Sequence, residues 1–386
     1  MNRDTVLLTN GRLPKAMDVA RALHRAGCRV GIAEPFSMHL AKVSNCVDFT
    51  PRVRAPRHSK SGYLDDLRVL VARERAAVLV PVSEETVHVA ALHGNLGTTT
   101  RVFTMPQPEV LAVHDKVSFV AVAETAGVAV PRTALLGSAE AQNIAEACDF
   151  VIKPRLGCAG RGVGLFACGD ALPEPDPAVP ALVQQRIRGE ECSSFSVAHE
   201  GRVIGTVVYR GVLRSGTVAV CFEQVRDQPA VEGWVERFVA ARAWSGFIAF
   251  DFIVDAAGTP WGLECNPRAN SGIHFVTEDS LAQAVLQPRS TAALRFRSPG
   301  WRQQFYSCLT EAQARMWRRG FGDYVKVLRR ARDVTWDRRD PLPFWLMTFT
   351  ASNLLWASFR SGRPIGEIAT DDISWYEDPP AIPGAP

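Results

Sequence analysis

The segment from residue 246 to residue 270 constrains the fold most, because it predicts a β-hairpin that is unusual in its polar residues. An apolar and aromatic run covers residues 247–254, and the turn sequence Asp-Ala-Ala-Gly follows at 255–258. A second strand pattern then runs from residue 261 to residue 265. Two short apolar runs separated by turn residues are typical of an antiparallel hairpin.

Symmetric folding about residues 257 and 258 would place Asp251 opposite Glu264 and Ala249 opposite Asn266. Side chains alternate between the two faces of a strand. We therefore expect one face to carry Asp251, Glu264 and Asn266, and the other to carry Phe250, Phe252 and Leu263.

Facing carboxylates repel each other, and a buried carboxylate without a partner is costly or becomes protonated. A metal ion is the simplest compensating cation. Carboxylate and amide oxygens without His or Cys suit Mg²⁺, which often completes its shell with water and substrate phosphates. The hairpin therefore predicts nucleotide chemistry. The alternative is a surface hairpin with solvated acids, and the apolar run around Asp251 argues against it.

The N-terminal part of the chain has the pattern of a parallel α/β unit. Strands are predicted at 5–8, 29–33 and 78–82, with helices at 14–26 and 63–75 between them. Residues 9–13 lack GxGxxG, so dinucleotide binding is not indicated there. Glu84 and Glu85 follow the third strand, at the edge where such sheets bind ligands. They either help to bind substrate or are solvated acids at the start of a helix.

A second unit is predicted to start near His114 with a helix that runs to Ala126. The chain alternates afterwards between short strands and loops, and from residue 289 onward it is predicted to be mainly helical. The expected strands cover residues 128–131, 150–154, 162–166, 182–186, 194–198 and 202–209.

A glycine-rich loop follows the predicted strand at 150–154. Lys153 lies on that strand, and the loop combines glycines with cations, namely Arg155, Gly157, Gly160, Arg161 and Gly162. Glycine lets backbone N–H groups approach an anion, and Lys and Arg neutralise its charge, so a lid over a polyphosphate is expected. The Walker pattern is absent.

The sequence "VQQRIRGEE" from residue 183 to residue 191 predicts a strand that leads into a short hinge. Such a hinge can offer backbone groups to an adenine edge, and an acid beyond it can accept hydrogen bonds from ribose hydroxyls. Glu191 is the candidate acid. Considered alone, Glu190 and Glu191 would be solvated loop acids.

The order of these motifs resembles that of the ATP-grasp superfamily. Lys116 comes first, then Lys153 with the glycine loop, then the hinge, and finally Asp251, Glu264 and "NPR". The resemblance covers residues 110–290. The sequence "ECNPR" is similar to the E-x-N-P-R of the carbamoyl-phosphate-synthetase and biotin-carboxylase branch. The resemblance implies an N-terminal α/β pre-grasp domain at 1–112, an ATP-grasp domain at 113–290 with a lid subdomain near 117–188, and a helical region at 291–386.

The resemblance also implies roles for individual residues. Asp251, Glu264 and Asn266 would hold Mg²⁺, usually two ions, with Mn²⁺ as an alternative. Arg268 and Lys153 would be catalytic, with Arg268 stabilising an acyl-phosphate or the carboxylate being activated. ATP would be contacted by Lys116, Lys153, Arg155, Gly157, Gly160, Arg161, Gly162, Gln184, Ile187 and Glu191. Some grasp ligases carry an arginine where this chain has Ala249, and Arg268 or Arg155 is expected to replace it.

The implied activity is that of a carboxylate–amine ligase, which activates a small-molecule carboxylate with ATP for attack by an amine. Two alternatives stay open, namely activation of bicarbonate and ATP binding without turnover. His274 would either lie near the acceptor substrate or be a structural histidine. No nucleic-acid-binding motif accompanies the surplus of Lys and Arg in residues 301–340, which would bind an acidic partner or form a solvated helix face.

Nine cysteines, an odd number without a CxxC pair, predict reduced thiols in a cytoplasmic protein. Cys158 and Cys265 are expected to be packing residues rather than nucleophiles. The N-terminus lacks the pattern of a signal peptide. The uncharged segment 341–359 is expected to form a buried or oligomer-facing helix in a homo-oligomer, with a membrane-surface helix as the alternative.

Overall fold

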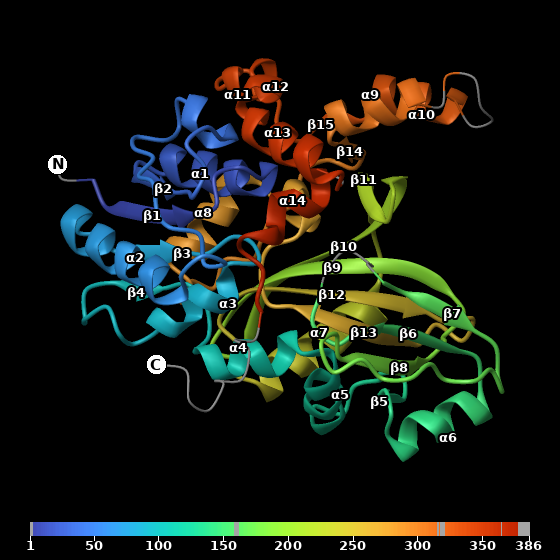
Figure 1. Ribbon diagram of the computed structural model, residues 1–386. Coiled ribbons are helices and arrows are strands. Elements are labelled where there is room, and N and C mark those ends of the chain that lie inside the picture. The colour runs from blue at the N-terminus through green and yellow to red at the C-terminus, as the bar shows by residue number, and fades with distance from the viewer. Residues whose placement is uncertain (1–2, 158–161, 315, 317–320, 364, 377–386) are drawn as a thin grey trace, which may run out of the picture.

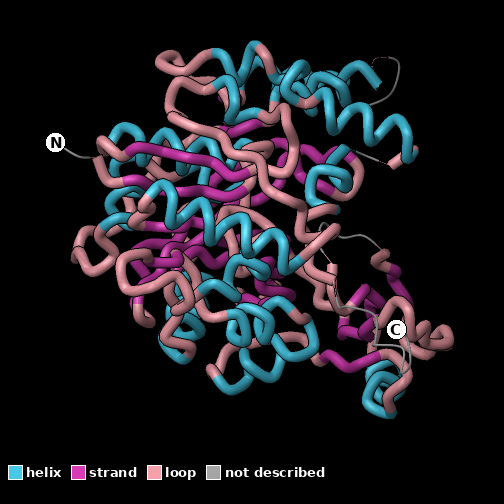
Figure 2. The backbone as a smooth tube through the Cα atoms, turned by 60° about the vertical axis from the view of Figure 1, so that its left-hand side comes forward, coloured by secondary structure: helices cyan, strands magenta, loops and turns pink. Residues whose placement is uncertain are grey.

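The computed structural model describes residues 3–157, 162–314, 316, 321–363 and 365–376. Three sheets organise this part of the chain: one parallel sheet near the N-terminus and two mainly antiparallel sheets (Figure 1). Helices and loops lie around the strands (Figure 2). The architecture is mixed α/β with a mainly helical C-terminal region, as the sequence predicts.

The parallel sheet has the order β2-β1-β3-β4, and its strands are β1 (Thr5–Thr9), β2 (Arg29–Ala33), β3 (Val78–Val80) and β4 (Arg101–Val102). Apolar runs form these strands because both faces are covered. The segments between and after them are α1 (Pro14–Arg25), η1 (Leu40–Val43), α2 (Lys60–Glu74), α3 (Thr86–Val89), η2 (Ala90–Leu92) and α4 (Gln107–His114). The predicted parallel α/β unit is confirmed.

The smaller antiparallel sheet has the order β5-β8-β6-β7. Its strands are β5 (Thr133–Leu135), β6 (Phe150–Pro154), β7 (Gly164–Phe166) and β8 (Ala181–Gln185), accompanied by α5 (Lys116–Thr125) and α6 (Ala139–Ala147). The strand predicted at 128–131 is wrong. That segment instead offers the carbonyl of Ala129 to Gly262 N at 3.0 Å and to Trp234 Nε1 at 2.9 Å. Pro131 has no N–H to extend a ladder.

The large sheet has the order β13-β12-β9-β10-β11-β14-β15. Its strands and the helix on it are β9 (Glu190–His199), β10 (Arg202–Ser215), β11 (Val218–Val225), β12 (Gly246–Val254), β13 (Pro260–Asn266), β14 (Trp301–Gln303), β15 (Arg332–Asp333) and α7 (Pro229–Ala241). The core between α7 and the sheet is aromatic: the ring centroids of Trp234 lie 4.9 Å from Phe250 and 5.0 Å from Phe252. This core holds the acidic hairpin rigidly.

The hairpin β12–β13 pairs as predicted around its acidic residues, with Asp251 opposite Glu264 and Ala249 opposite Asn266. The register shifts between Asp251 and Phe252, so a β-bulge separates the acidic pair from the turn. Leu263 is therefore only half-buried, and Cys265 rather than Leu263 joins the aromatic residues in the core. The face predicted for Leu263 is wrong because the bulge interrupts the alternation.

The C-terminal region contains mostly helices, and it adds two unpredicted short strands, β14 and β15, to the edge of the large sheet. Its helices are preceded by η3 (Ser271–Phe275) and α8 (Glu278–Leu286). They comprise α9 (Phe305–Ala314), α10 (Phe321–Arg330), α11 (Leu342–Trp345), α12 (Met347–Thr350), α13 (Ser352–Ser361) and α14 (Ile365–Asp371). On α10, Lys326, Arg329 and Arg330 are exposed, which supports the solvated-face interpretation.

The prediction of one buried helix at 341–359 is wrong, whereas its oligomer-facing alternative stays a prediction. Three short helices replace the single helix, and large apolar side chains such as Phe349 and Phe359 point to solvent, with exposures of 58% and 82%. A segment without charges can be buried at little desolvation cost. Its sequence does not determine, however, which other element covers it. Within the described residues, no helix is both long and apolar enough to cross a membrane.

Candidate active site

Asp251 lies at the centre of a cluster of polar side chains on β12 and its neighbours. Ser193 Oγ on β9 donates a hydrogen bond to Asp251 Oδ1 at 2.5 Å, and Asn266 Nδ2 on β13 donates one to Oδ2 at 3.1 Å. Burial raises the pKa of Asp251, and the facing carboxylate of Glu264 raises it further. This pair of carboxylates resists carrying two negative charges unless a cation is close.

Two buried lysines surround Glu264. Lys116 Nζ, at the start of α5, lies 3.4 Å from Glu264 Oε2, and Lys153 Nζ on β6 donates to Leu263 O at 3.2 Å. Burial alone would raise the pKa of Glu264, but the charges of Lys116 and Lys153 outweigh it, so that pKa is lowered. Burial lowers the pKa of Lys153 to about 8. The site therefore places two cationic amines beside the acidic pair.

Arg268 connects this cluster to Glu84 in the loop that follows β3 of the parallel sheet. Its Nη2 lies 2.6 Å from Glu84 Oε1 and donates to Asn266 Oδ1 at 2.9 Å. Burial would raise the pKa of Glu84, but Arg268 and other nearby cations lower it to about 2. Glu84 is thus ionised and fixes the arginine against the hairpin.

Glu85 has a different function from its neighbour. Its Oε1 accepts hydrogen bonds from Val82 N and Ser83 N, both at 2.9 Å, and from Thr9 Oγ1 at 2.7 Å. These bonds hold the loop that follows β3. Both Glu84 and Glu85 are buried, at 5% and 1% exposure, so their interpretation as solvated acids is wrong.

The glycine loop approaches the two lysines from the smaller sheet. Lys116 Nζ donates to Gly157 O at 2.6 Å, and Gly157 has a φ of 149° that favours glycine. Arg155 forms a two-point ion pair with Asp115, at 2.9 and 2.6 Å, and Asp115 also caps α5. Of the predicted loop residues, Gly162 is described with a φ of 67°, whereas Cys158, Gly160 and Arg161 lie outside the described residues.

The predicted hinge joins β8 to β9. Gln184 is buried and donates from Nε2 to Thr133 Oγ1 at 2.9 Å, while Ile187 is half-buried in the connection. Gly189 is required here, since a Cβ would lie 2.1 Å from Val254 O. Glu191 is on β9, has an exposed side chain and pairs with Arg214. Its role toward ribose stays a prediction.

Two further candidates are packing residues. His274 is buried, and its Nδ1 lies 2.6 Å from Asp18 Oδ2 on α1, which supports the structural interpretation. Cys265 is 3% exposed, and burial raises its pKa well above the ordinary value. The eight described cysteines are all free thiols.

Sequence reasoning missed three contributors to the site, namely Ser193, Asp115 and Lys15. Ser193 reaches Asp251 only because β9 pairs with β12, and Lys15 Nζ donates to Ala269 O at 2.9 Å across two domains. Neither pairing leaves a local signal. Asp115 had one, because Asp directly before a helix is a common N-cap.

The donor set of the hairpin fits a hard divalent cation. Two carboxylates face each other, and Asn266 beside them turns Nδ2 toward Asp251 and Oδ1 toward Arg268. Burial and the facing carboxylate raise the pKa of Asp251, so a cation at this position would be stabilising. Asn266 Oδ1 already accepts from Arg268, but an amide oxygen has a second lone pair for an ion. Groups of three or more His, Cys, Asp or Glu suited to a metal are absent from the described residues, so water and substrate oxygens would complete the shell.

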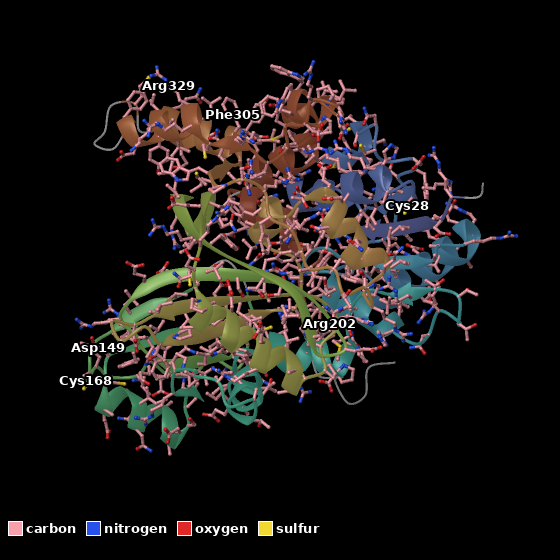
Figure 3. The ribbon with its side chains drawn as sticks, turned by 180° about the vertical axis from the view of Figure 1, so that it is seen from behind. Cys28, Asp149, Cys168, Arg202, Phe305 and Arg329 are labelled. Atoms are coloured by element: carbon pink, nitrogen blue, oxygen red, sulfur yellow. The ribbon has the colours of Figure 1, made fainter. Side chains whose placement is uncertain are left out.

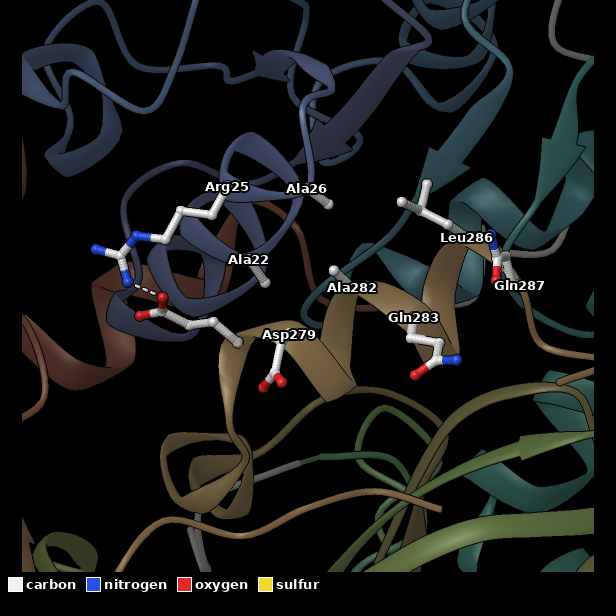
Figure 4. A pocket seen from close by; sticks show the side chains of 9 residues that line it. Ala22, Arg25, Ala26, Asp279, Ala282, Gln283, Leu286 and Gln287 are labelled. Atoms are coloured by element: carbon white, nitrogen blue, oxygen red, sulfur yellow. Dashed lines mark ion pairs between the residues drawn. The ribbon is translucent and has the colours of Figure 1, made fainter. Parts of the chain in front are cut away.

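A separate groove of about 530 Å³ lies between α1 and α8 (Figure 4). It is lined by Ala22, Arg25, Ala26, Glu278, Asp279, Ala282, Gln283, Leu286 and Gln287. Arg25 pairs across it with Glu278. The lining contains none of the predicted site residues.

Comparison with known proteins finds one family model that matches part of this chain. Residues 113–272 match the family model described as an ATP-grasp domain. No curated protein matches this chain.

Several solved structures share the fold. Carboxyaminoimidazole ribonucleotide synthase from Aspergillus clavatus, complexed with ATP, has a TM-score of 0.62 and 14% identity, covering 82% of this chain and 87% of that chain. The biotin carboxylase domain of 2-oxoglutarate carboxylase from Hydrogenobacter thermophilus, with MgADP and bicarbonate, has a TM-score of 0.60 and 16% identity, covering 78% and 74%. An L-amino acid ligase from Bacillus licheniformis has a TM-score of 0.57 and 14% identity, covering 74% and 75%.

Proposed function

From the match of residues 113–272 to the family model of an ATP-grasp domain, we propose that the protein is an ATP-dependent, ADP-forming ligase. Its substrates would be a small-molecule carboxylate and an amine, joined as an amide or peptide bond. The observation that carries the proposal is the facing pair Asp251 and Glu264, with Lys116 beside Glu264 and Asn266 bound to Asp251. This arrangement suits a magnesium-bound polyphosphate.

Asp251, Glu264 and Asn266 would hold Mg²⁺, which when bound neutralises and aligns the phosphates of ATP. Lys116 and Lys153 would bind phosphate oxygens, because both ammonium groups are buried next to Glu264 and both lie near the glycine loop. Phosphate binding would favour the charged form of Lys153, whose pKa burial lowers to about 8. The connection at 186–189 would contact adenine.

Arg268 would bind the carboxylate that becomes activated. Its guanidinium is held by Glu84 on one side and Asn266 on the other, so it is fixed next to the metal-binding hairpin. A carboxylate oxygen then attacks the γ-phosphorus of ATP, and the bond to ADP breaks. The amine nitrogen attacks the acyl carbon of the resulting acyl-phosphate, loses a proton and displaces phosphate. Positioning and charge stabilisation account for catalysis without a protein nucleophile.

A second candidate function is the activation of bicarbonate. It is favoured by the likeness to the biotin carboxylase domain, whose structure holds bicarbonate. In this case the same Arg268 would face bicarbonate, and carboxyphosphate would replace the acyl-phosphate. The two functions share the metal site and differ in the acid that enters.

The experiment is to measure ADP release from the purified protein with ATP and Mg²⁺, using amino acids and other small carboxylates singly and in pairs. We expect release that requires both a carboxylate and an amine, and mass spectrometry of the product identifies both substrates. Release stimulated by bicarbonate alone would support the second function. ATP binding without stimulated release by any of these acids would contradict both.

A further inference from the structure

The C-terminal helices expose a row of large apolar side chains, which we call the aromatic stripe. Its members are Leu342, Trp345, Leu346, Phe349, Leu355, Trp356 and Phe359. Trp345, Trp356 and Phe359 are exposed by 64%, 62% and 82%. Side chains three and four residues apart lie on one face of a helix, and this spacing relates Leu342 to Trp345 on α11 and Leu355 and Trp356 to Phe359 on α13. An apolar surface of this kind is rarely left in water without a function.

The aromatic rings of this surface are ordered by contacts with each other. The centroids of Trp356 and Phe359 lie 6.2 Å apart in a stacked arrangement, and those of Trp336 and Trp345 lie 6.0 Å apart edge to face. Trp336 is itself 46% exposed. The protein thus presents Trp and Phe side chains to solvent in fixed positions, rather than burying them against its own core.

The charged side chains beside the aromatic stripe are mixed in sign, but the acids among them, such as Asp337, Asp340 and Glu367, are held in ion pairs with arginines. Residues 341–366 contain no Asp or Glu in the sequence. Arg338 and Arg339 precede the stripe and Arg360 ends it, and all three are exposed. Within the described part of the chain, none of these three arginines forms an ion pair. The surface therefore combines exposed aromatic rings with uncompensated positive charge.

We propose that the aromatic stripe docks this protein on the surface of an anionic lipid membrane. Trp, Phe and Leu would enter the boundary between headgroups and acyl chains, and Arg338, Arg339 and Arg360 would meet lipid phosphates. Charge complementarity selects this partner over a second copy of the chain. In a twofold pair the same basic surface would face itself, and the whole chain has a net charge of +4.

The position of the aromatic stripe is compatible with access of small substrates to the ATP-grasp domain. Helices α11, α12 and α13 lie at the end of the molecule opposite α5 and α6 (Figure 1). Seen from behind, Phe305 and Arg329 of α9 and α10 again lie far from Asp149 and Cys168, which are next to the ends of β6 and β7 (Figure 3). A membrane at the C-terminal helices would leave the smaller sheet and its glycine loop in water.

The test is flotation of the full-length protein with vesicles in a density gradient. Vesicles of phosphatidylcholine with about 30% phosphatidylglycerol are compared with pure phosphatidylcholine. We expect stronger partitioning onto the anionic vesicles, weakened by about fivefold for each of Arg338→Gln and Arg339→Gln. The double variant Trp356→Ala/Phe359→Ala should reduce partitioning by about tenfold or more. Absence of binding to anionic vesicles, or equal binding by this double variant, would overturn the proposal.

Val69→Ala provides the matched control, since Val69 is 63% exposed on α2, away from the aromatic stripe. Its partitioning should equal that of the wild type. A second measurement identifies the competing occupant: sedimentation velocity without lipid compares the wild type with Trp356→Ala/Phe359→Ala. A wild-type dimer that becomes a monomer in this variant would assign the stripe to self-association and overturn the membrane proposal. An unchanged sedimentation coefficient, with lost flotation, supports it.

Discussion

The acidic hairpin β12–β13 and the C-terminal segment 341–359 are both rich in apolar residues, but the hairpin buries most of its large side chains and the segment exposes most of them. Phe252 is 1% exposed, whereas Phe359 is 82% exposed. In the hairpin, Phe250, Phe252 and Cys265 pack in the core, while Asp251, Glu264 and Asn266 carry the polar groups of the site. In the C-terminal segment, η1 and α14 cover only one side, where Leu354 packs, and large apolar side chains on the rest are exposed. The comparison shows that an apolar pattern predicts a face, while burial requires a partner.

The largest expected effect is a difference in the free energy of unfolding between variants of these two regions. Phe252→Ala should lower the free energy of unfolding by about 3–5 kcal/mol, because it removes a ring packed against Trp234. Phe359→Ala should change it by less than about 0.5 kcal/mol, since the ring is exposed in the folded chain. Denaturant titrations of both variants measure the difference. Equal losses would mean that the stripe is buried in solution.

Substitutions on the polar face of the hairpin should change the activity of the protein. Glu264→Gln is expected to lower turnover about 10²- to 10³-fold, because it removes a carboxylate charge from the proposed magnesium site. Glu191→Gln is the control, since Glu191 is an exposed acid whose proposed ribose contact would be to an uncharged group; it should raise the KM for ATP with little change in kcat. Turnover of Glu264→Gln at the wild-type level and ordinary Mg²⁺ would falsify the site.

Glu84 and Glu85 offer a finer test, because they are adjacent and equally buried but hold different groups. Glu84→Gln should lower kcat about 10- to 100-fold by loosening Arg268, and a shift in KM for the carboxylate should accompany it. Glu85→Gln should lower the free energy of unfolding by about 2 kcal/mol, because the loop after β3 loses a charged acceptor. If Glu85→Gln lowered activity and Glu84→Gln lowered stability instead, the positioning role of Glu84 would be contradicted.

The smallest expected effect concerns how the C-terminal region is attached. His88 Nε2 lies 3.3 Å from Ser374 O, and burial lowers the pKa of His88 to about 4. Between this value and the unfolded pKa near 6.5, the unfolded chain binds the extra proton, so stability falls as pH decreases. We expect a loss of about 1 kcal/mol from His88 between pH 7.5 and pH 5.5. His88→Gln should have a flatter stability profile over this range; an equally steep profile would contradict the assignment.

The sequence was sufficient for much of the hairpin and for part of the site. The alternation of side chains along a strand, with a short turn, predicts that Asp251 faces Glu264. Local patterns also place Lys116 and Lys153 near the ends of their helix and strand. The contact of Arg268 with Glu84 joins two domains, and Ser193 meets Asp251 through strand pairing. Such long-range pairings depend on how sheets and domains pack, which no local pattern encodes. The β-bulge that displaces Leu263 and the exposure of the aromatic stripe are of the same kind.

Calorimetric titration of ATP into the protein, with and without Mg²⁺, tests most directly whether the hairpin is a metal-dependent ATP site. For the wild type we expect Mg²⁺ to strengthen ATP binding, and for Asp251→Asn we expect this strengthening to be lost while the protein remains folded. Circular dichroism and the unfolding midpoint check the fold. An identical gain from Mg²⁺ in both proteins would contradict the assignment of Asp251 and Glu264 as the metal-binding pair.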